Sequence, residues 1–321
     1  MTRTQRLTRT TSTALTLAAV ALSAAALFAL VGCAAKPAAT VPPVVPPAAA
    51  FPVTITDDSS QSVTINTEPQ RIVSLAPANT EIAFALGLGD KVVGVTTYDD
   101  YPAEVTKIAK VGDFTTPNFE AIAAANPDLV LATTGVQADA IKKLKDLGAT
   151  VIAIDPQNLA GVYVDIERVG KATGTGEKAA SLVSDMKAQV ASVQKAVEST
   201  PPVTAFVEIA QNPLYTVGKG TIIDELMTLA GGTNVVTQPS YVAYASEQVI
   251  AADPQVYLAT KGSMSDPAAL AKRAGFGKLT AVKNKRVYVL DDNLVSRPGP
   301  RVVLGLKQIA EALHPEAFAG N

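Results

Sequence analysis

The sequence predicts an α/β protein with two similarly built lobes, and three observations lead to this prediction. A stretch occurs twice: residues 120–133 read EAIAAANPDLVLAT and residues 247–260 read EQVIAADPQVYLAT. In each copy an acid opens an Ala-rich run, Asn-Pro or Asp-Pro ends it and an apolar run follows, which indicates helix, break and buried strand. A fainter echo joins residues 86–93 to 229–236 in the same order. Finally, strands alternate with helices, which favours a mainly parallel sheet in each lobe.

The N-terminus has the pattern of a bacterial lipoprotein signal. Arg3, Arg6 and Arg9 precede an apolar run over 14–31, which leads into Gly32 and Cys33. Such a signal is cut before a cysteine that then carries lipid, so we expect residues 1–32 to be a signal peptide and Cys33 the lipidation site. An uncleaved membrane-spanning anchor is the alternative. The lipoprotein interpretation is preferred because Cys33 is the only cysteine and stands where the cut belongs.

The composition of the mature chain favours two domains stabilised by core burial. Removal of residues 1–32 leaves 289 of the 321 residues and takes away three arginines but no acid, so the net charge falls from −2 to −5. Cysteine occurs once, so no internal disulfide can form. Without a basic block or any Trp, the chain offers little for nucleic acid to bind.

Pro and Gly divide the rest of the chain into four parts. Residues 33–52 are rich in Pro and Ala and are expected to form an extended tether. A hairpin over 53–65 opens an N-terminal lobe, 53–157, a helical region follows over 158–200, and a C-terminal lobe fills 201–321.

Both lobes are expected to alternate strands with helices. Asn79 or Thr80 is predicted to cap the first helix, residues 81–86, because its side chain can accept an orphan backbone N–H. The expected strands lie at 71–75, 92–95, 129–132, 151–154, 204–209 and 287–290; further helices are expected at 138–147, 222–229 and 301–313.

The second helix of the middle region, residues 177–199, has one apolar stripe that includes Val183, Met186 and Val190. At about 1.5 Å per residue it would span about 35 Å, enough to run along both lobes as a strut. An ordinary surface helix packed on one sheet fits the stripe equally well.

No catalytic constellation stands out, so binding is favoured over catalysis and no cofactor or metal is predicted. His314 is the sole histidine and is expected to be solvated near the chain end, which argues against a Ser-His-Asp triad and a zinc site. The pairs Asp57-Asp58, Asp99-Asp100 and Asp291-Asp292 offer oxygen ligands for a hard cation, but paired loop acids are usually solvated.

Aromatic residues follow several predicted strands. Phe114 and Tyr241 stand six residues before the acids that open the two repeats, and further loop tyrosines occur at 98, 101, 215 and 244. Ligands of open α/β sheets bind outside the carboxyl ends of the strands, so a cleft between the lobes would place some of these rings against a ligand.

Several motifs resemble the cobalamin and ferric-siderophore class of substrate-binding proteins of ABC importers, most closely its cobalamin-binding members. They are RIVSLAPANTEIAFALG at 71–87, YDDYP at 98–102, NFE at 118–120, NPLYTVGK at 212–219 and SRPGPR at 296–301. The resemblance extends from about Arg71 to the end of the chain. It implies two Rossmann-like lobes joined by one rigid helix, with the ligand held between them.

By motif position, the resemblance implies ligand contacts from six residues: Ala78, Tyr98 and Phe114 in the first lobe, and Tyr215, Tyr241 and Arg297 in the second. Phe114 and Tyr241 stand where cobalamin-binding relatives can carry tryptophan, which keeps an aromatic face but leaves the ligand open. Without the resemblance, Arg297 reads as a solvated loop arginine.

The opening acids of the repeats, Glu120 and Glu247, match the glutamates with which this family docks on arginines of the two permease subunits. A pair of equivalent acids suits a two-fold partner. The alternative is that each acid only complements the positive end of its helix, worth roughly 0.3–1 kcal/mol.

The resulting hypothesis is a monomeric, lipid-anchored, extracytoplasmic receptor that delivers a corrinoid, with cobalamin as first candidate, to an ABC permease without covalent chemistry. A ferric siderophore or haem is the second candidate, and several arginines in the cleft would favour an anionic siderophore. The rivals of other classes are a cell-surface enzyme that uses paired aspartates and an adhesive lipoprotein.

Overall fold

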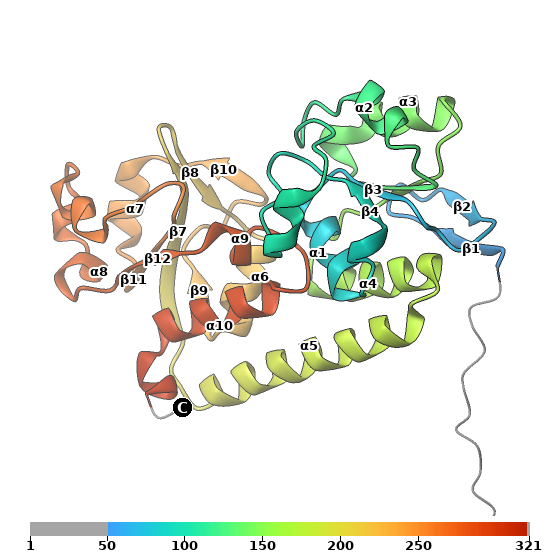
Figure 1. Cartoon of the computed structure of the whole chain (residues 1–321). Coiled ribbons are helices and arrows are strands. Elements are labelled where there is room, and N and C mark those ends of the chain that lie inside the picture. Colours follow the sequence, from blue (N-terminus) through green and yellow to red (C-terminus); the bar gives the residue numbers. More distant parts are fainter. Residues whose placement is uncertain (1–50, 320–321) are drawn as a thin grey trace, which may run out of the picture. The chain divides into compact units, whose positions relative to one another are not determined.

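A computed structural model describes residues 51–319, which form one compact unit with two lobes, each built on its own sheet (Figure 1). The predicted signal peptide, Cys33 and nearly all of the tether lie outside the described residues. A two-stranded antiparallel hairpin, β1 (Val53–Thr56) and β2 (Ser62–Ile65), precedes the first lobe as expected.

The N-terminal lobe contains a four-stranded, fully parallel sheet in the order β4-β3-β5-β6. Its strands are short apolar runs buried on both faces, as parallel sheets require. The strands are β3 (Ile72–Ser74), β4 (Val92–Gly94), β5 (Leu129–Ala132) and β6 (Val151–Ala153); the helices are α1 (Pro77–Ala85), α2 (Phe119–Ala124) and α3 (Ala138–Asp146), with 3-10 turns η1 (Gly89–Lys91), η2 (Ala103–Lys107) and η3 (Gly135–Gln137).

The C-terminal lobe contains a six-stranded mixed sheet. Its main order is β10-β8-β7-β11-β12, with β9 parallel to β7; the β7-β8 and β8-β10 pairs are antiparallel. The strands are β7 (Val203–Gln211), β8 (Leu214–Val217), β9 (Gly232–Asn234), β10 (Tyr241–Ala243), β11 (Val256–Thr260) and β12 (Val287–Leu290); the helices are α6 (Ile222–Leu229), α7 (Ser246–Ala252), α8 (Thr280–Lys283), α9 (Asp292–Val295) and α10 (Val302–Leu313), with η4 (Pro267–Lys272), η5 (Phe276–Lys278) and η6 (Pro315–Phe318).

Two helices connect the lobes. Helix α4 (Leu159–Thr173) starts at Asn158, whose side chain accepts the Gly161 N–H, and ends at Gly174, which adopts a φ of 74°. Helix α5 (Gly176–Val197) then packs on α4 and also on α6, α10 and η6 of the second lobe. Because α4 itself packs on α1 and β1, the two helices together bridge the lobes, as the strut interpretation requires.

The repeated stretch folds the same way in both lobes. It forms α2 and β5 in the first and α7 and β11 in the second, and the residue before each proline, Asn126 or Asp253, has a φ of 45° or 40°. Two residues later, Asp128 accepts the Arg71 N–H at 3.0 Å and Gln255 accepts the Thr204 N–H at 2.9 Å. Each copy thus fastens its strand to the start of the strand beside it.

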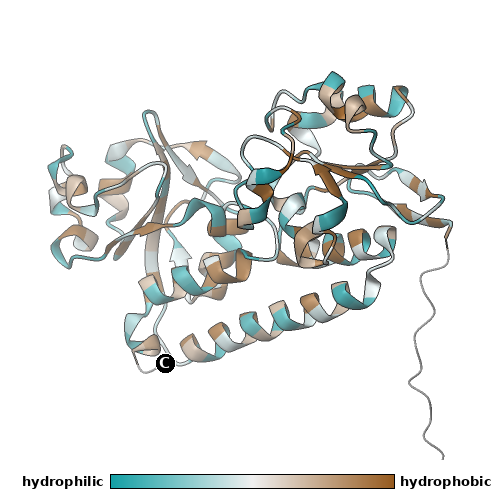
Figure 2. Ribbon diagram, in the orientation of Figure 1, coloured by the Kyte–Doolittle hydropathy of each residue, from teal (hydrophilic) through white to brown (hydrophobic). Residues whose placement is uncertain are grey.

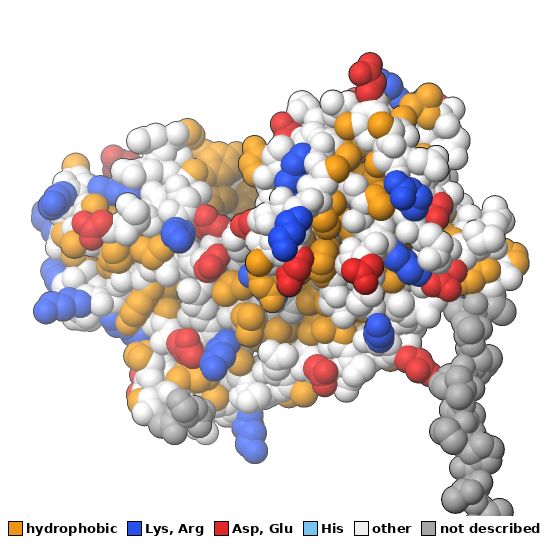
Figure 3. Space-filling model, viewed as in Figure 1, with side chains coloured by type: hydrophobic (Ala, Val, Ile, Leu, Met, Phe, Trp, Pro, Cys, Tyr) orange, Lys and Arg blue, Asp and Glu red, His pale blue; other side chains and the backbone are white. Residues whose placement is uncertain are grey.

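Apolar side chains form one cluster that extends through both lobes and smaller clusters under the outer helices. Coloured by hydropathy, the central strands are mostly apolar, whereas many helices mix apolar and polar residues along their length (Figure 2). Charged side chains of both signs are interspersed over the visible face (Figure 3). None of the helices between residues 51 and 319 is long and apolar enough to cross a membrane.

Two local predictions were wrong. Helix α1 begins at Pro77, so neither Asn79 nor Thr80 is its cap; Ala76 holds the N-cap position without a side-chain hydrogen bond. Proline has no N–H to satisfy and its φ suits the first turn, which explains the earlier start. His314 is buried rather than solvated, because the chain end packs against Gly231, where an added Cβ would lie 2.8 Å from the His314 Nε2.

Candidate ligand cleft

A cavity of about 440 Å³ opens at the carboxyl ends of the strands of the first sheet. In the order β4-β3-β5-β6, the connection from β3 leads to β4 on one side and the connection from β5 leads to β6 on the other. A crevice therefore forms between β3 and β5, where open α/β sheets bind ligands. The cavity lies there: Ala76, Pro77 and Ala78 follow β3, Thr133 follows β5, and Asp155 follows β6. Its walls come from both lobes, since Ser296, Arg297 and Pro298 also line it.

A second cavity of about 450 Å³ continues the first towards the C-terminal lobe. The two have four lining residues in common: Asp155, Pro156, Ser296 and Pro298. Lys219, Thr221 and Tyr241 supply the far wall. We refer to the two cavities together as the inter-lobe cleft; Figure 3 shows hydrophobic side chains in a hollow between the lobes.

Five of the six residues expected to contact a ligand line this cleft. Ala78, Tyr98, Phe114 and Arg297 lie in the first cavity and Tyr241 in the second. Tyr98 and Tyr241 have 59% and 46% of their surface exposed, so much of each ring is free to contact a ligand.

Tyr215, the sixth residue, lines neither cavity. It lies on β8 directly opposite Ala243 of β10 and is 37% exposed. Tyr241 is two residues before Ala243, so the two tyrosines are diagonal neighbours on one face of the sheet, about 7–8 Å apart at Cα. Tyr215 therefore extends the aromatic surface beyond the cavity.

The loop that presents Phe114 is fixed by two polar residues. The Asp113 carboxylate accepts hydrogen bonds from the backbone N–H and the hydroxyl of both Thr115 and Thr116, at 2.7–2.9 Å. These bonds lower the Asp113 pKa to about 2, the Thr116 hydroxyl contributing most. Buried Gln137 donates to the carbonyls of Phe114 and Leu75, each at 2.7 Å, and so ties this loop to the end of β3.

Sequence reasoning missed Gln137, Asp155, Ser296 and Pro298. A signal existed for part of this set, because Asp155-Pro156 directly follows a strand, as ligand-contacting residues often do. Gln137 gave no signal, since a single glutamine at the start of a helix looks like any surface residue.

Arg297 lines the cleft, but its guanidinium is already bound by protein groups. It donates to Asp100 Oδ1 at 2.5 Å and to Glu81 Oε1 and the Tyr98 carbonyl at 3.4 Å. Lys219, the other cation of the lining, pairs with Asp224 at 3.1 Å. The cleft therefore presents no cation without a carboxylate partner among the lining residues described above.

The paired aspartates do not converge on the cleft. Asp57 and Asp58 accept hydrogen bonds from Ser59 and Arg168, and Asp292 accepts the Gly262 N–H at 2.8 Å. Asp99 is buried against Thr96, and burial raises the pKa of Asp99 despite hydrogen bonds from Thr80 and Thr96. In the described range, acids, histidine and cysteine form no group of three that could hold a metal.

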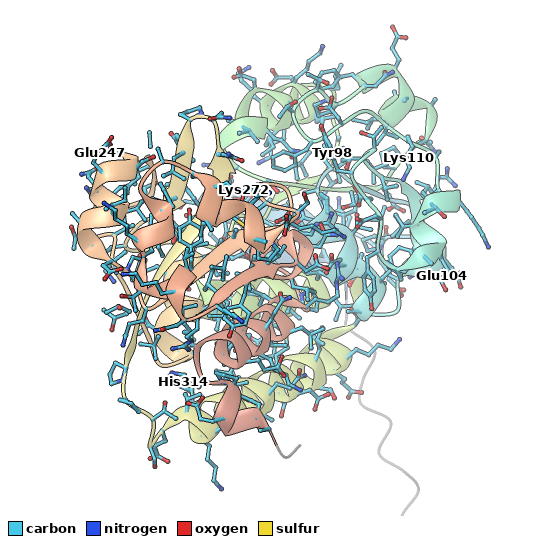
Figure 4. All side chains as sticks on the ribbon, turned by 90° about the vertical axis from the view of Figure 1, so that its left-hand side faces the viewer. Tyr98, Glu104, Lys110, Glu247, Lys272 and His314 are labelled. Carbon is cyan, nitrogen blue, oxygen red and sulfur yellow. The ribbon has the colours of Figure 1, made fainter. Side chains whose placement is uncertain are left out.

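The two acids expected to dock on a permease occupy equivalent sites. Glu120 is the second residue of α2 and Glu247 the second of α7, and both are exposed. Glu247 lies at the periphery of its lobe, away from the cleft residue Tyr98 (Figure 4). A cavity of about 260 Å³ lies beside Glu247, lined also by Asn212, Leu214 and Ser246.

Comparison with known proteins assigns the family. Residues 72–294 match the model of the family described as "Periplasmic binding protein". The "Uncharacterized ABC transporter substrate-binding lipoprotein YvrC" of Bacillus subtilis is 42% identical over 275 residues, 83% of this chain and 87% of that protein. The "Vitamin B12-binding protein" of Vibrio parahaemolyticus is 31% identical over 254 residues, 78% of this chain and 92% of that protein.

Solved structures show the same fold with other ligands in their descriptions. A Staphylococcus epidermidis protein, described as a possible iron-binding (periplasmic solute-binding) protein, is 32% identical with a TM-score of 0.70, covering 77% of this chain and all of that one. The periplasmic heme-binding protein RhuT of Roseiflexus sp. RS-1 is 28% identical with a TM-score of 0.71, covering 77% and 99%. The chain therefore belongs to the periplasmic binding protein family: it is an extracytoplasmic, membrane-anchored substrate-binding protein of an ABC transporter and not an enzyme.

Proposed function

We propose that the protein captures a corrinoid, with cobalamin as the first candidate, and hands it to its ABC permease while lipid on Cys33 holds it at the membrane. The observation that carries the proposal is an aromatic-walled inter-lobe cleft with no unpaired cation. Its two adjoining cavities, of about 440 and 450 Å³, would give room to a large ligand. Tyr98, Phe114 and Tyr241 offer flat faces, as a macrocycle needs.

Charge supports a corrinoid over an anionic siderophore. A receptor for an anionic siderophore is expected to present several free arginines or lysines. Here Arg297 and Lys219 are both engaged by carboxylates, and Asp155 adds a negative charge to the lining. A corrinoid, whose periphery carries mainly amides, needs hydrogen-bonding groups rather than counter-charges.

Haem is the second candidate, since the similar proteins include a vitamin B12-binding protein and a heme-binding protein. A protein tyrosine can ligate haem iron as the phenolate, which requires loss of its proton. The cleft walls disfavour the charged form, and this desolvation raises the pKa of Tyr241 although part of its ring stays exposed. Ligation of haem iron by Tyr241 would have to overcome this desolvation, while the iron charge itself would favour the phenolate.

Calorimetric titration with cobalamin, cobinamide, haem and a panel of ferric siderophores tests the proposal. One-to-one corrinoid binding is expected, weakened by Tyr98→Ala and by Tyr241→Ala but not by Tyr215→Ala, which lies outside both cavities. If haem or a siderophore gives a binding signal and the corrinoids give none, the ligand is haem or a siderophore and not a corrinoid. Silence with every compound would point to a ligand of another class.

Docking on the permease through Glu120 and Glu247 is the second part of the proposal. Equal positions in the first turns of α2 and α7 give each permease subunit the same exposed carboxylate, which an arginine can pair. Glu120→Arg combined with Glu247→Arg should leave ligand affinity unchanged and abolish transport by cells. Unchanged uptake would refute this docking mode.

A further inference from the structure

Four charged side chains join the two lobes beside the cleft, and we call them the inter-lobe clasp. Glu81 on α1 and Asp100 in the loop after β4 come from the first lobe. Arg297 and Arg301, which flank the Pro-Gly-Pro turn before α10, come from the second. The partners are separated by about 200 residues in sequence, so the clasp exists only in the folded chain.

The contacts of the clasp are close and partly sheltered from water. Arg301 donates to both Glu81 oxygens, at 2.9 and 2.6 Å, in the bidentate geometry that gives strong ion pairs. The Glu81 side chain is only 2% exposed, and those of Arg297 and Arg301 are 16% and 18% exposed. Asp100 also accepts from Asn293 at 3.1 Å.

An aromatic ring and a glycine complete the junction. The Arg301 guanidinium lies 3.8 Å from the ring centroid of Tyr101, which suits a cation–π contact. Gly299 approaches α1 so closely that an added Cβ would lie 3.3 Å from the Ala78 carbonyl oxygen. The turn over 297–301 is therefore seated directly on the start of α1.

Charge within the clasp is balanced, with two carboxylates facing two guanidinium groups. Burial opposes ionisation of Asp100, but its hydrogen bond with Arg297 and the Arg297 charge outweigh this effect and lower the Asp100 pKa. The hydrogen bond from Arg301 to Glu81 likewise raises the pKa of Arg301. Asp100 and Arg301 are thus charged at neutral pH, and Arg297, held by Asp100 and Glu81, has no surplus charge to offer a ligand.

Only Arg297 of the four lines the cleft, yet each of the other three is close to a residue that does. Glu81 lies three residues after Ala78 on α1, Asp100 two residues after Tyr98, and Arg301 three residues after Pro298. Movement of a clasp residue would therefore displace a wall of the cleft.

We propose that Glu81, Asp100 and Arg301 are positioning residues that fix the width of the cleft and that the two carboxylates, by neutralising Arg297, make the cleft select against anionic ligands. This inference refines the corrinoid proposal and rests on it for the choice of probes. It also reassigns Arg297, whose main partners are Asp100 and Glu81.

The charge part of the inference is tested with Asp100→Asn, which keeps the side-chain shape but frees Arg297. Cobinamide and haem are titrated into the full chain, purified in detergent. Haem affinity relative to cobinamide should rise about tenfold in the variant, the size of one gained charge-assisted contact. Loosening of the fold alone would weaken both ligands and leave their ratio constant, and a constant ratio would overturn this part. Asp100→Glu should restore the wild-type ratio.

The positioning part is tested without any ligand. In Arg301→Gln, amide hydrogen exchange should accelerate in both 98–102 and 293–301, because the variant releases both sides of the junction. Arg301→Lys should be intermediate, since lysine keeps the charge but cannot form the bidentate pair. Lys307→Gln is the matched control: Lys307 lies on α10 but pairs only with exposed Glu311 on the same helix.

Unchanged exchange in Arg301→Gln, or equal acceleration in Lys307→Gln, would overturn the clasp. If the wild type binds neither cobinamide nor haem, the corrinoid proposal fails while hydrogen exchange still decides whether the clasp holds the lobes.

Discussion

The two lobes use the same fourteen-residue module around different interiors. In both, a short helix carries an exposed acid, a residue with positive φ precedes a proline, and a buried strand follows. The position held by Val130 in β5 is held by Tyr257 in β11. Val130 packs in an apolar cluster, whereas the Tyr257 hydroxyl donates to buried Glu208 at 2.5 Å, and Glu208 is also paired with Arg273. The module therefore fixes where the acid and the strand lie, but not what fills the lobe.

Replacement of Glu208 should lower the free energy of unfolding more than replacement of Val130 in the first lobe. Glu208→Leu would leave Arg273 mostly buried without its carboxylate, and loss of one partner of a buried pair costs about 3–5 kcal/mol. Urea denaturation at 25 °C measures the free energy of unfolding. Val130→Ala, which removes apolar contacts from the first lobe, should cost about 2 kcal/mol. A smaller loss for Glu208→Leu than for Val130→Ala would contradict the contrast between the two interiors.

Tyr257→Phe sharpens the comparison, because it deletes one hydroxyl and keeps the ring. Glu208 would lose one donor but keep Arg273, so the expected cost is about 1–3 kcal/mol, the usual range for a buried group that loses a hydrogen bond. The same denaturation series measures it. The rings of Phe206 and Phe276, with centroids 5.2 and 6.2 Å from that of Tyr257, should keep their packing. Stability equal to wild type would mean that the hydroxyl contributes nothing.

The side chains with which each module binds the neighbouring strand should differ less in their contribution to the free energy of unfolding. Asp128 accepts the N–H groups of Gln70 and Arg71, and Gln255 accepts that of Thr204. Hydrogen bonds to charged acceptors are stronger, so Asp128→Ala should cost about 1–2 kcal/mol and Gln255→Ala about 0.5–1 kcal/mol. Hydrogen exchange at the starts of β3 and β7 would locate each loss in its own lobe, and a loss spread over both would show that the modules are not independent.

The smallest effect on stability is expected from Asp113, whose turn beside Phe114 lies outside the repeated module. The pKa of Asp113 falls from 3.8 to about 2 on folding, so its stabilising effect is complete above the unfolded value and is lost as pH falls through about 2. The difference in Tm between wild type and Asp113→Ala should therefore be constant from pH 7 to about 5 and shrink towards pH 2. A constant difference throughout would exclude the carboxylate as its cause.

Much of the fold could be predicted because its elements are local. Helix α6 has the expected bounds, 222–229, and the strands at 129–132 and 287–290 were also correct, since each is a short apolar run between polar residues. The start of α1 was missed because Asn79 and Thr80 resemble caps, whereas Pro77 already provides the first helical φ.

Contacts between distant parts of the chain could not be predicted. His314 is buried because the chain end packs against Gly231. Arg297 is bound by carboxylates that lie about 200 residues earlier in the sequence. No pattern in neighbouring residues reports such pairs. Five of the six residues expected to contact a ligand do line the cleft, whereas the position of Tyr215 beyond the two cavities depends on the pairing of β8 with β10, which could not be read from the sequence.

Every strand of the first sheet precedes α4, and every strand of the second follows α5, so the chain passes from one lobe to the other once. Each lobe is thus one uninterrupted segment of the gene, and the exposed residues Pro201 and Pro202 mark the junction. A single genetic crossover there would exchange a whole lobe between two relatives, with one wall of the cleft and one of the two acids proposed to dock on the permease. Such a hybrid would need to match its partner along α5, at the clasp and where Glu225 of α6 accepts the Leu159 N–H, which gives recombination a simple route to new ligand preferences.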